Sequence, residues 1–182
     1  MKLDALNVLL LGLAGAGCAT TTSQLRLPPL QTVDHVDLQR YLGVWYEIAL
    51  FPQSFEKGCT GTSATYSLRR DGDIEVVNRC HRGSLDGPVK VAKGRARVTD
   101  RASNAKLEVS FFWPFWGAYW IIDLDPGYQY AAVGHPSRDY LWILSRTPHL
   151  APEVYDRLLE RVKAQGYDLS RLQRTIQAGS PP

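Results

Sequence analysis

The stretch that decides the fold is Arg40-Tyr41-Leu42-Gly43-Val44-Trp45-Tyr46-Glu47-Ile48. A glycine followed two positions later by a tryptophan opens the first apolar strand of the chain. Gly43 lets the backbone bend out of the preceding turn, where a Cβ atom would restrict it. On a strand with a two-residue period, Trp45 then points inward and can plug the closed end of a barrel.

Beyond this stretch, the chain alternates short apolar segments with turn-forming residues. Turns such as Arg70-Asp71-Gly72-Asp73 and Asp125-Pro126-Gly127 separate them. We expect seven further strands, at residues 62–68, 74–79, 89–99, 106–112, 116–124, 128–134 and 140–146. Eight short strands with hairpin-length links indicate an up-and-down barrel or a sandwich.

One amphipathic helix is expected after the last strand, over residues 152–165. Its apolar side chains fall on one stripe, Pro152 suits the first turn, and Gly166 suits the stop. The stripe consists of Val154, Tyr155, Leu158, Leu159 and Val162. A single helix of this kind is expected to pack on the outside of the sheet.

The N-terminal stretch has the organisation of an export signal. An apolar run over residues 6–17 follows Lys2 and is shorter than the roughly 20 residues that a membrane-spanning helix needs. It ends in small residues directly before Cys18, as in a bacterial lipobox, whose cysteine is acylated. The alternative is an ordinary secretory peptide in which Cys18 is discarded or left free. We predict a cleaved lipoprotein signal peptide over residues 1–17 and palmitate on Cys18.

Three further segments follow the signal. The first is rich in Thr, Ser, Gln and Pro without an apolar period, which is typical of a flexible tether. We assign residues 18–32 to this tether, 33–176 to a barrel with its C-terminal helix, and 177–182 to a disordered tail.

Composition excludes several classes of function. The chain has 182 residues, 45% of them hydrophobic and 21% charged, which suits one globular domain. A formal net charge of +3, with acids and bases interspersed, is too small to argue for nucleic acid. The histidines have no metal-ligand spacing, and no nucleophile elbow surrounds Ser145. We therefore expect no metal, no cofactor, no catalytic residue and no nucleic-acid partner.

The remaining cysteines are Cys59 and Cys80. In an exported protein, an even number of cysteines besides the acylated one predicts a disulfide. Both cysteines lie at the end of the first hairpin opposite its turn, but a simple register brings Cys80 nearer to Ser63 than to Cys59. We therefore expect the loop before Cys59 to fold back over the strand so that the sulfurs meet.

Four segments, in order, resemble the lipocalin family, and among its members the bacterial outer-membrane lipoprotein lipocalins; apolipoprotein D is a more distant relative. The segments are residues 41–48, 64–68, 109–112 and 139–148. The resemblance implies an all-β fold with one C-terminal α-helix: an eight-stranded antiparallel up-and-down β-barrel. It also implies a barrel floor made of Gly43, Trp45 and Arg146, with the arginine across the tryptophan ring.

At the other end of the barrel, the rim loops carry clustered aromatic side chains. They include Phe51, Phe55, Trp113, Phe115 and Trp116. Such a cluster suggests an opening for lipid, a membrane-docking surface or a subunit contact, while the alternative is that the rings fold inward to roof the barrel.

The ligand pocket is expected in the barrel interior. The resemblance to apolipoprotein D places Tyr66, Asn78 and Trp142 on its wall, and strand alternation adds Phe111. Ala132, on the strand paired with that of Trp142, is expected to face the same lumen. An eight-stranded barrel either fills its interior with side chains or holds one small ligand.

The leading hypothesis is a lipid-binding protein of the bacterial cell envelope. It would bind a single-chain lipid, either a fatty acid or a lysophospholipid, for storage, transport or membrane maintenance. The resemblance implies an outer-membrane location, lipid-anchored through Cys18 and facing the periplasm, with a homodimer as a further option. The alternatives are an envelope interaction module or dimer with a packed barrel, and, with least support, a lipid-modifying enzyme.

Overall fold

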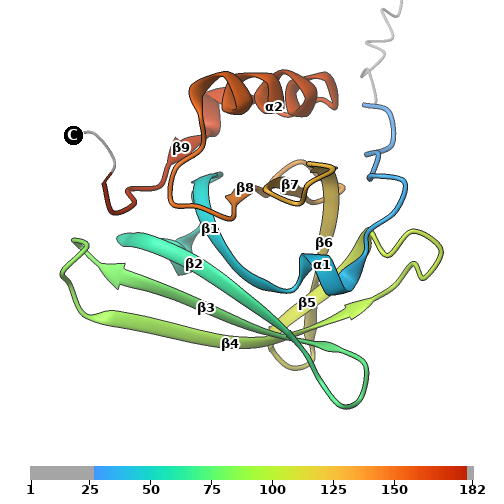
Figure 1. Cartoon of the computed structure of the whole chain (residues 1–182), viewed down its shortest axis with the longest axis horizontal. Coiled ribbons are helices and arrows are strands. Elements are labelled where there is room, and N and C mark those ends of the chain that lie inside the picture. Colours follow the sequence, from blue (N-terminus) through green and yellow to red (C-terminus); the bar gives the residue numbers. More distant parts are fainter. Residues whose placement is uncertain (1–26, 180–182) are drawn as a thin grey trace, which may run out of the picture.

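The computed structural model describes residues 27–179, which form a closed antiparallel barrel with a helix along its outer wall (Figure 1). Each barrel strand pairs with the next, and β1 pairs with both β2 and β8, which closes the sheet. The strands are β1 (Gly43–Leu50), β2 (Cys59–Leu68), β3 (Ile74–Arg82), β4 (Val89–Val98), β5 (Lys106–Phe112), β6 (Phe115–Leu124), β7 (Tyr130–Gly134) and β8 (Leu141–Ser145). The predicted eight-stranded up-and-down barrel with one C-terminal helix is confirmed.

The helix α2 (Pro152–Ala164) covers one side of the barrel. Tyr155, Leu158 and Val162 of the predicted stripe are buried against the sheet. No helix within residues 27–179 combines the length and the apolar character that crossing a membrane requires. Four short elements complete the fold: α1 (Leu38–Tyr41), η1 (Ser54–Glu56), η2 (Leu169–Arg171) and β9 (Gln173–Arg174).

Strand alternation divides the apolar side chains between two cores. One lies inside the barrel and contains Trp45, Tyr66 and Leu107. The other lies between the outer wall and α2 and contains Ile143 and Leu158. Because α2 packs on one outer face of the sheet, apolar side chains are buried there as well as in the barrel lumen.

Two residues expected elsewhere belong to the outer core. Phe51, predicted at the rim, is fully buried with the α2 side chains. The register of β1 against β8 shifts between Glu47 and Ala49, and such a bulge moves the following side chains to the opposite face. Ala132 also lies in the outer core, because it pairs with Ile143, while Val133 pairs with Trp142.

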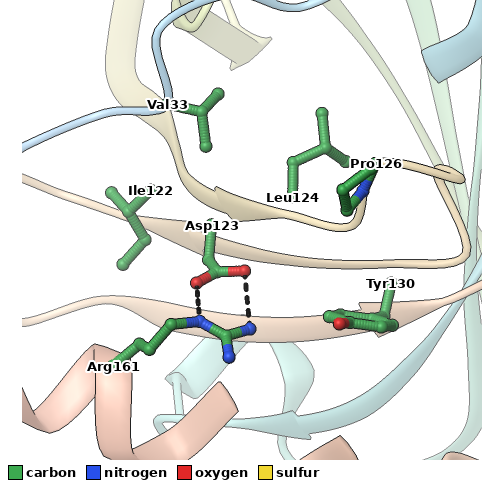
Figure 2. Close-up of a pocket in the computed structure, with 7 residues that line it drawn as sticks. All are labelled: Val33, Ile122, Asp123, Leu124, Pro126, Tyr130 and Arg161. Atoms are coloured by element: carbon green, nitrogen blue, oxygen red, sulfur yellow. Dashed lines mark hydrogen bonds and ion pairs between the residues drawn. The ribbon is translucent and has the colours of Figure 1, made fainter. Parts of the chain in front are cut away.

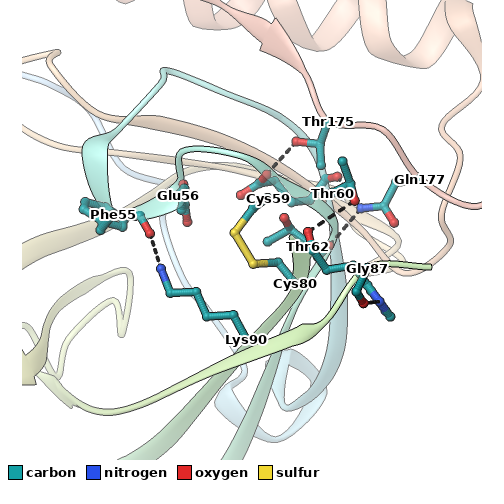
Figure 3. The surroundings of a disulfide bond; sticks show 12 residues. Phe55, Glu56, Cys59, Thr60, Thr62, Cys80, Gly87, Lys90, Thr175 and Gln177 are labelled. Atoms are coloured by element: carbon teal, nitrogen blue, oxygen red, sulfur yellow. Dashed lines mark hydrogen bonds between the residues drawn. A yellow bond between two sulfur atoms is a disulfide. The ribbon is translucent and has the colours of Figure 1, made fainter. Parts of the chain in front are cut away.

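The predicted disulfide between Cys59 and Cys80 is present, with Cα atoms 5.4 Å apart (Figure 3). The expected path of the chain was wrong, since no loop folds back over the strand. Instead β2 begins at Cys59 itself, and its register against β3 shifts between Thr60 and Ser63. This irregularity lets Cys59 pair with Arg82, two positions beyond Cys80.

The folded domain starts earlier than residue 33. Leu30, assigned to the tether, is buried in the outer core. The Pro28 carbonyl accepts a hydrogen bond of 2.6 Å from Nη2 of Arg138. Residues 18–26 of the predicted tether, Cys18 among them, and the predicted signal peptide lie outside the described residues.

The domain also ends later than residue 176. Gln177, assigned to a disordered tail, is buried. Its Nε2 donates to the carbonyls of Glu47 and Thr62, each at 2.8 Å. The C-terminal segment therefore joins β1 to β2 at the level where the sheet is irregular.

Candidate ligand-binding cavity

The closed end of the barrel is organised around Arg146 and Trp45. The Arg146 guanidinium lies 3.9 Å from the centroid of the buried Trp45 ring. Its Nη1 and Nη2 donate to the carbonyls of Val44 and Arg40, at 2.9 and 2.6 Å. Gly43 has a φ of +94°, and a Cβ atom there would lie 3.4 Å from Arg146 Nη1. The three residues predicted for the floor thus lie together.

Above this floor the barrel encloses a cavity of about 820 Å³. The four residues predicted for the pocket wall, Tyr66, Asn78, Phe111 and Trp142, all line it. Gly94 makes room for one of them, since a Cβ atom at this position would lie 2.8 Å from the Phe111 ring. The volume falls within the range of roughly 300–1,000 Å³ that is usual for small-molecule sites.

Three tyrosines form a polar network low in the cavity. The Tyr119 hydroxyl lies 2.8 Å from that of Tyr41 and 2.9 Å from that of Tyr66. Burial raises the pKa of Tyr66 to about 12, so the network is neutral and hydrogen-bonded. Sequence reasoning missed Tyr41 and Tyr119, although Tyr119 is two positions from inward-facing Ile121 and alternation could have found it.

Three carboxyl groups also line the cavity: Glu47 on β1, Glu56 on η1 and Asp139 in the loop before β8. Glu47 is only 5% exposed, and the Thr175 hydroxyl donates to its Oε1 at 2.5 Å. Burial, followed by the nearby charge of Glu56, raises the pKa of Glu47 to about 8. Burial also raises the pKa of Glu56, whose Oε2 accepts a 3.4 Å hydrogen bond from Nε1 of Trp142.

The mouth of the cavity carries exposed aromatic rings. The exposed fractions are 54% for Phe55, 81% for Phe112, 84% for Trp113 and 77% for Phe115. Phe55, Phe112 and Phe115 also line the cavity. Three of the predicted rim residues, Phe55, Trp113 and Phe115, are thus exposed at the mouth. Phe112, which the sequence analysis did not assign to the rim, is exposed there too.

Trp116, the remaining predicted rim residue, is partly covered. It lines the cavity, and the Arg97 guanidinium lies 4.2 Å from its ring centroid. Its ring is therefore shielded on one face, whereas the neighbouring rings at the hairpin tip are open to solvent.

A second hollow lies on the outer wall, and the two charged side chains that line it already bind each other (Figure 2). Arg161 reaches Asp123 across it, with Nε–Oδ2 and Nη2–Oδ1 distances of 2.5 and 3.0 Å. Within residues 27–179, no group of three or more His, Cys, Asp or Glu side chains is placed to hold a metal ion. The barrel cavity is therefore the candidate site.

A closed eight-stranded barrel with one open mouth, a plugged floor and a lined cavity defines a binding protein for a small hydrophobic ligand. The Lipocalin-like domain family matches residues 36–177. The chain belongs to the lipocalin family, whose members are binding proteins and not enzymes.

Named relatives support this membership. The chain is 44% identical to the outer membrane lipoprotein Blc of Escherichia coli K12 over 155 residues, covering 84% of this chain and 87% of that protein. It is 41% identical to temperature-induced lipocalin-1 of Arabidopsis thaliana over 162 residues, covering 84% and 86%. With apolipoprotein D of Mus musculus, identity is 38% over 164 residues, covering 85% and 82%.

Solved structures agree on the fold. Insecticyanin from the tobacco hornworm Manduca sexta superposes with a TM-score of 0.65 at 21% identity, covering 82% of this chain and 85% of that one. At this level of identity the likeness concerns the barrel architecture alone.

Proposed function

We propose that this lipocalin binds a single-chain lipid, a fatty acid or a lysophospholipid, in its barrel. Its role would be lipid storage, transport or membrane maintenance in the bacterial cell envelope. The observation that carries this proposal is the cavity of about 820 Å³, walled by Phe111 and Trp142 and open at one end. Each CH₂ group buried there contributes about 0.8 kcal/mol, so an acyl chain can bind through contact area alone.

The mouth suits transfer of lipid to and from a membrane. Phe112, Trp113 and Phe115 project from the β5–β6 hairpin, and Phe55 stands on η1, between β1 and β2. Exposed aromatic clusters of this kind mark interaction sites, and aromatic rings are favoured at the membrane interface. We propose that a lipid surface is what these rings contact.

The path of the N-terminal segment supports the same orientation. The Pro28 carbonyl is bound by Arg138, which belongs to the loop between β7 and β8. His135 and Asp139 of that loop line the cavity. The chain thus joins the domain beside the mouth, so an anchor upstream of residue 27 would hold the mouth near the bilayer.

We propose that this anchor is a lipid on Cys18, which would place the protein at the outer membrane on its periplasmic side. The sequence before Cys18 supports the acylation. The location is supported by relatives called outer membrane lipoprotein, from Escherichia coli and from Vibrio cholerae, at 44% and 40% identity.

The alternatives are a packed barrel, a homodimer and a lipid-modifying enzyme, and they are supported to different degrees. A packed barrel is disfavoured by the cavity, since its walls would have to collapse to fill it. A homodimer through the rim aromatics is compatible with lipid binding, and its formation in solution would change the role proposed for the rim. Turnover of a lipid would need a nucleophile or base beside the bound chain, and the family offers no support for one.

The decisive experiment is mass spectrometry of lipid that co-purifies with the full chain, followed by titration of the stripped protein with single-chain lipids. Saturable quenching or enhancement of tryptophan fluorescence is expected, because Trp142 lines the cavity. Absence of any co-purified lipid, together with no saturable signal for any single-chain lipid, would refute the proposal. Light scattering with and without lipid separates monomer from dimer.

A further inference from the structure

Two carboxyl groups high in the cavity lack an ionic partner within residues 27–179. Glu47 and Glu56 both line it, and neither forms an ion pair within the described part of the chain. Lys90 lines the same region, but its Nζ donates to the Phe55 carbonyl at 2.5 Å (Figure 3). Arg79 and His135 also line the cavity, as does Asp139, which pairs with Arg171. A ligand entering the mouth therefore meets charges of both signs, and Glu47 and Glu56 are the lining carboxyl groups that have no ion pair among the described residues.

Unsatisfied oxygen atoms in the same wall extend this pattern. Thr62 is 6% exposed, lines the cavity, and its Oγ1 has no hydrogen-bond partner among the described residues. The same holds for Oδ1 of Asn78, on the neighbouring strand. A buried polar atom without a partner is costly, which makes both atoms ready to bind a polar group of a ligand.

These groups lie near one another. Gln177 Nε2 donates to the backbone carbonyls of both Glu47 and Thr62, so the two residues are neighbours across β1 and β2. Asn78 pairs with Ala64, two positions along β2 from Thr62. Glu56 stands close enough to Glu47 for its charge to raise the pKa of that carboxyl group.

We propose that Glu47, Glu56, Thr62 and Asn78 form a head-group subsite for a primary ammonium, and that the preferred ligand is a single-chain lipid carrying this group. The inference deepens the proposed function and rests on it. A primary ammonium offers three N–H donors to a wall made largely of acceptors, whereas a trimethylammonium offers none. Its charge would favour the ionised form of the carboxyls, which burial opposes.

Lys90 adds a second element of recognition. Its ammonium group is the cation near Glu56, and it can turn from the Phe55 carbonyl to an anion at the mouth. A phosphodiester linked to an ammonium would thus meet Lys90 and the carboxyl pair together. A fatty acid carboxylate would gain Lys90 but would oppose the ionisation of Glu47 and Glu56, which an ammonium favours.

The test compares three lipids with the same acyl chain: a lysophosphatidylethanolamine, a lysophosphatidylcholine and a fatty acid. Stripped full-length protein should bind the ethanolamine lipid about tenfold more tightly than the choline lipid, the value of one well-placed charge-assisted hydrogen bond. Glu56→Gln should remove most of this preference and strengthen fatty acid binding, because the amide keeps the acceptor for Trp142 but not the charge. Glu160→Gln, on the exposed face of α2, is the matched control and should bind as the wild type.

If the Glu47→Gln variant folds, it should lose the preference for the ethanolamine lipid as Glu56→Gln does. If it does not fold, the Glu56→Gln variant alone tests the subsite. Lys90→Gln should weaken both phospholipids and the fatty acid. Equal affinity of the wild type for the ethanolamine and choline lipids would overturn the subsite while leaving lipid binding intact. So would an unchanged preference in Glu56→Gln. Failure to bind any of the three lipids would instead overturn the proposed function itself.

Discussion

The hydroxyl of Thr175 donates to Oε1 of Glu47 at 2.5 Å, joining the C-terminal segment to the first barrel strand across 128 positions of sequence. Thr175 N also donates to the Ile48 carbonyl at 3.0 Å. The segment after η2 therefore pairs with the edge of β1 beyond the residues that pair with β2, next to the buried carboxyl group of Glu47. Glu47 therefore affects both the stability of the fold and the proposed recognition of the ligand.

The first prediction concerns pH. The pKa of Glu47 rises from 4.5 to about 8 on folding, so between these values the folded protein keeps a proton that the unfolded chain releases. The free energy of unfolding should therefore fall as pH rises through this window. Thermal melts of stripped protein at a series of pH values measure the slope.

Glu47→Gln should flatten that slope, because the amide resembles the protonated acid. The comparison is needed because burial lowers the pKa of His135, which acts in the opposite direction. Parallel pH profiles for the wild type and Glu47→Gln would contradict the assignment.

The second prediction concerns the floor. Trp45→Ala should lower the free energy of unfolding by about 3–5 kcal/mol, as expected for a fully buried aromatic residue. Arg146→Ala should cost less, because the guanidinium is only partly buried and its cation–π contact is worth at most about 2 kcal/mol. Arg97→Ala removes an exposed contact to Trp116 of similar geometry and should cost less still. A urea midpoint unchanged by Trp45→Ala would refute the role of the floor.

The third prediction concerns the lumen. Ala92 lines the cavity, so Ala92→Phe should weaken lipid binding by about tenfold or more while leaving the barrel folded. Ala102→Phe adds the same ring in an exposed turn and serves as the control. Lipid titration followed by tryptophan fluorescence measures the effect, and equal affinities for the two variants would show that lipid binds elsewhere.

The fourth prediction concerns the disulfide. Thiol titration of unfolded, unreduced Cys18→Ser protein should find no free thiol, and reduction should release Cys59 and Cys80. Replacing both with serine should lower the free energy of unfolding by about 2–4 kcal/mol. Two reactive thiols before reduction would contradict the pairing in the exported protein.

The fifth prediction concerns the anchor. Cys18→Ser should abolish palmitate labelling in cells and release the protein from the membrane fraction, because no other acylation site is proposed. Cys59→Ser is the control and should remain labelled. Labelling of Cys18→Ser, or a mature protein that begins at another residue, would disprove the anchor.

The sequence by itself determined the architecture. Gly43 and Trp45 signalled the floor, the turns separated eight strands, and the stripe on residues 152–165 required one outer helix. These are local properties: a turn needs particular residues, a half-buried strand alternates, and a helix repeats with its own period. The pocket wall could be assigned in advance because it follows from alternation within strands and from family resemblance.

Only the tertiary structure decided which face some side chains take. A bulge after Glu47 turned Phe51 away from the rim, and the β7–β8 register placed Ala132 under the helix. Side chains alternate with a period of two, so one inserted residue or one step of register exchanges lumen and outer wall. No local pattern specifies that step.

Tertiary structure also decided how far the domain extends and what lies inside it. Leu30 and Gln177 stand beyond the boundaries that composition suggested, yet both are buried. The cluster of Glu47, Glu56 and Thr62 joins separate segments, and its character depends on burial, which raises the pKa of both carboxyl groups. Such properties belong to contacts between distant positions, so they arise only when the barrel closes.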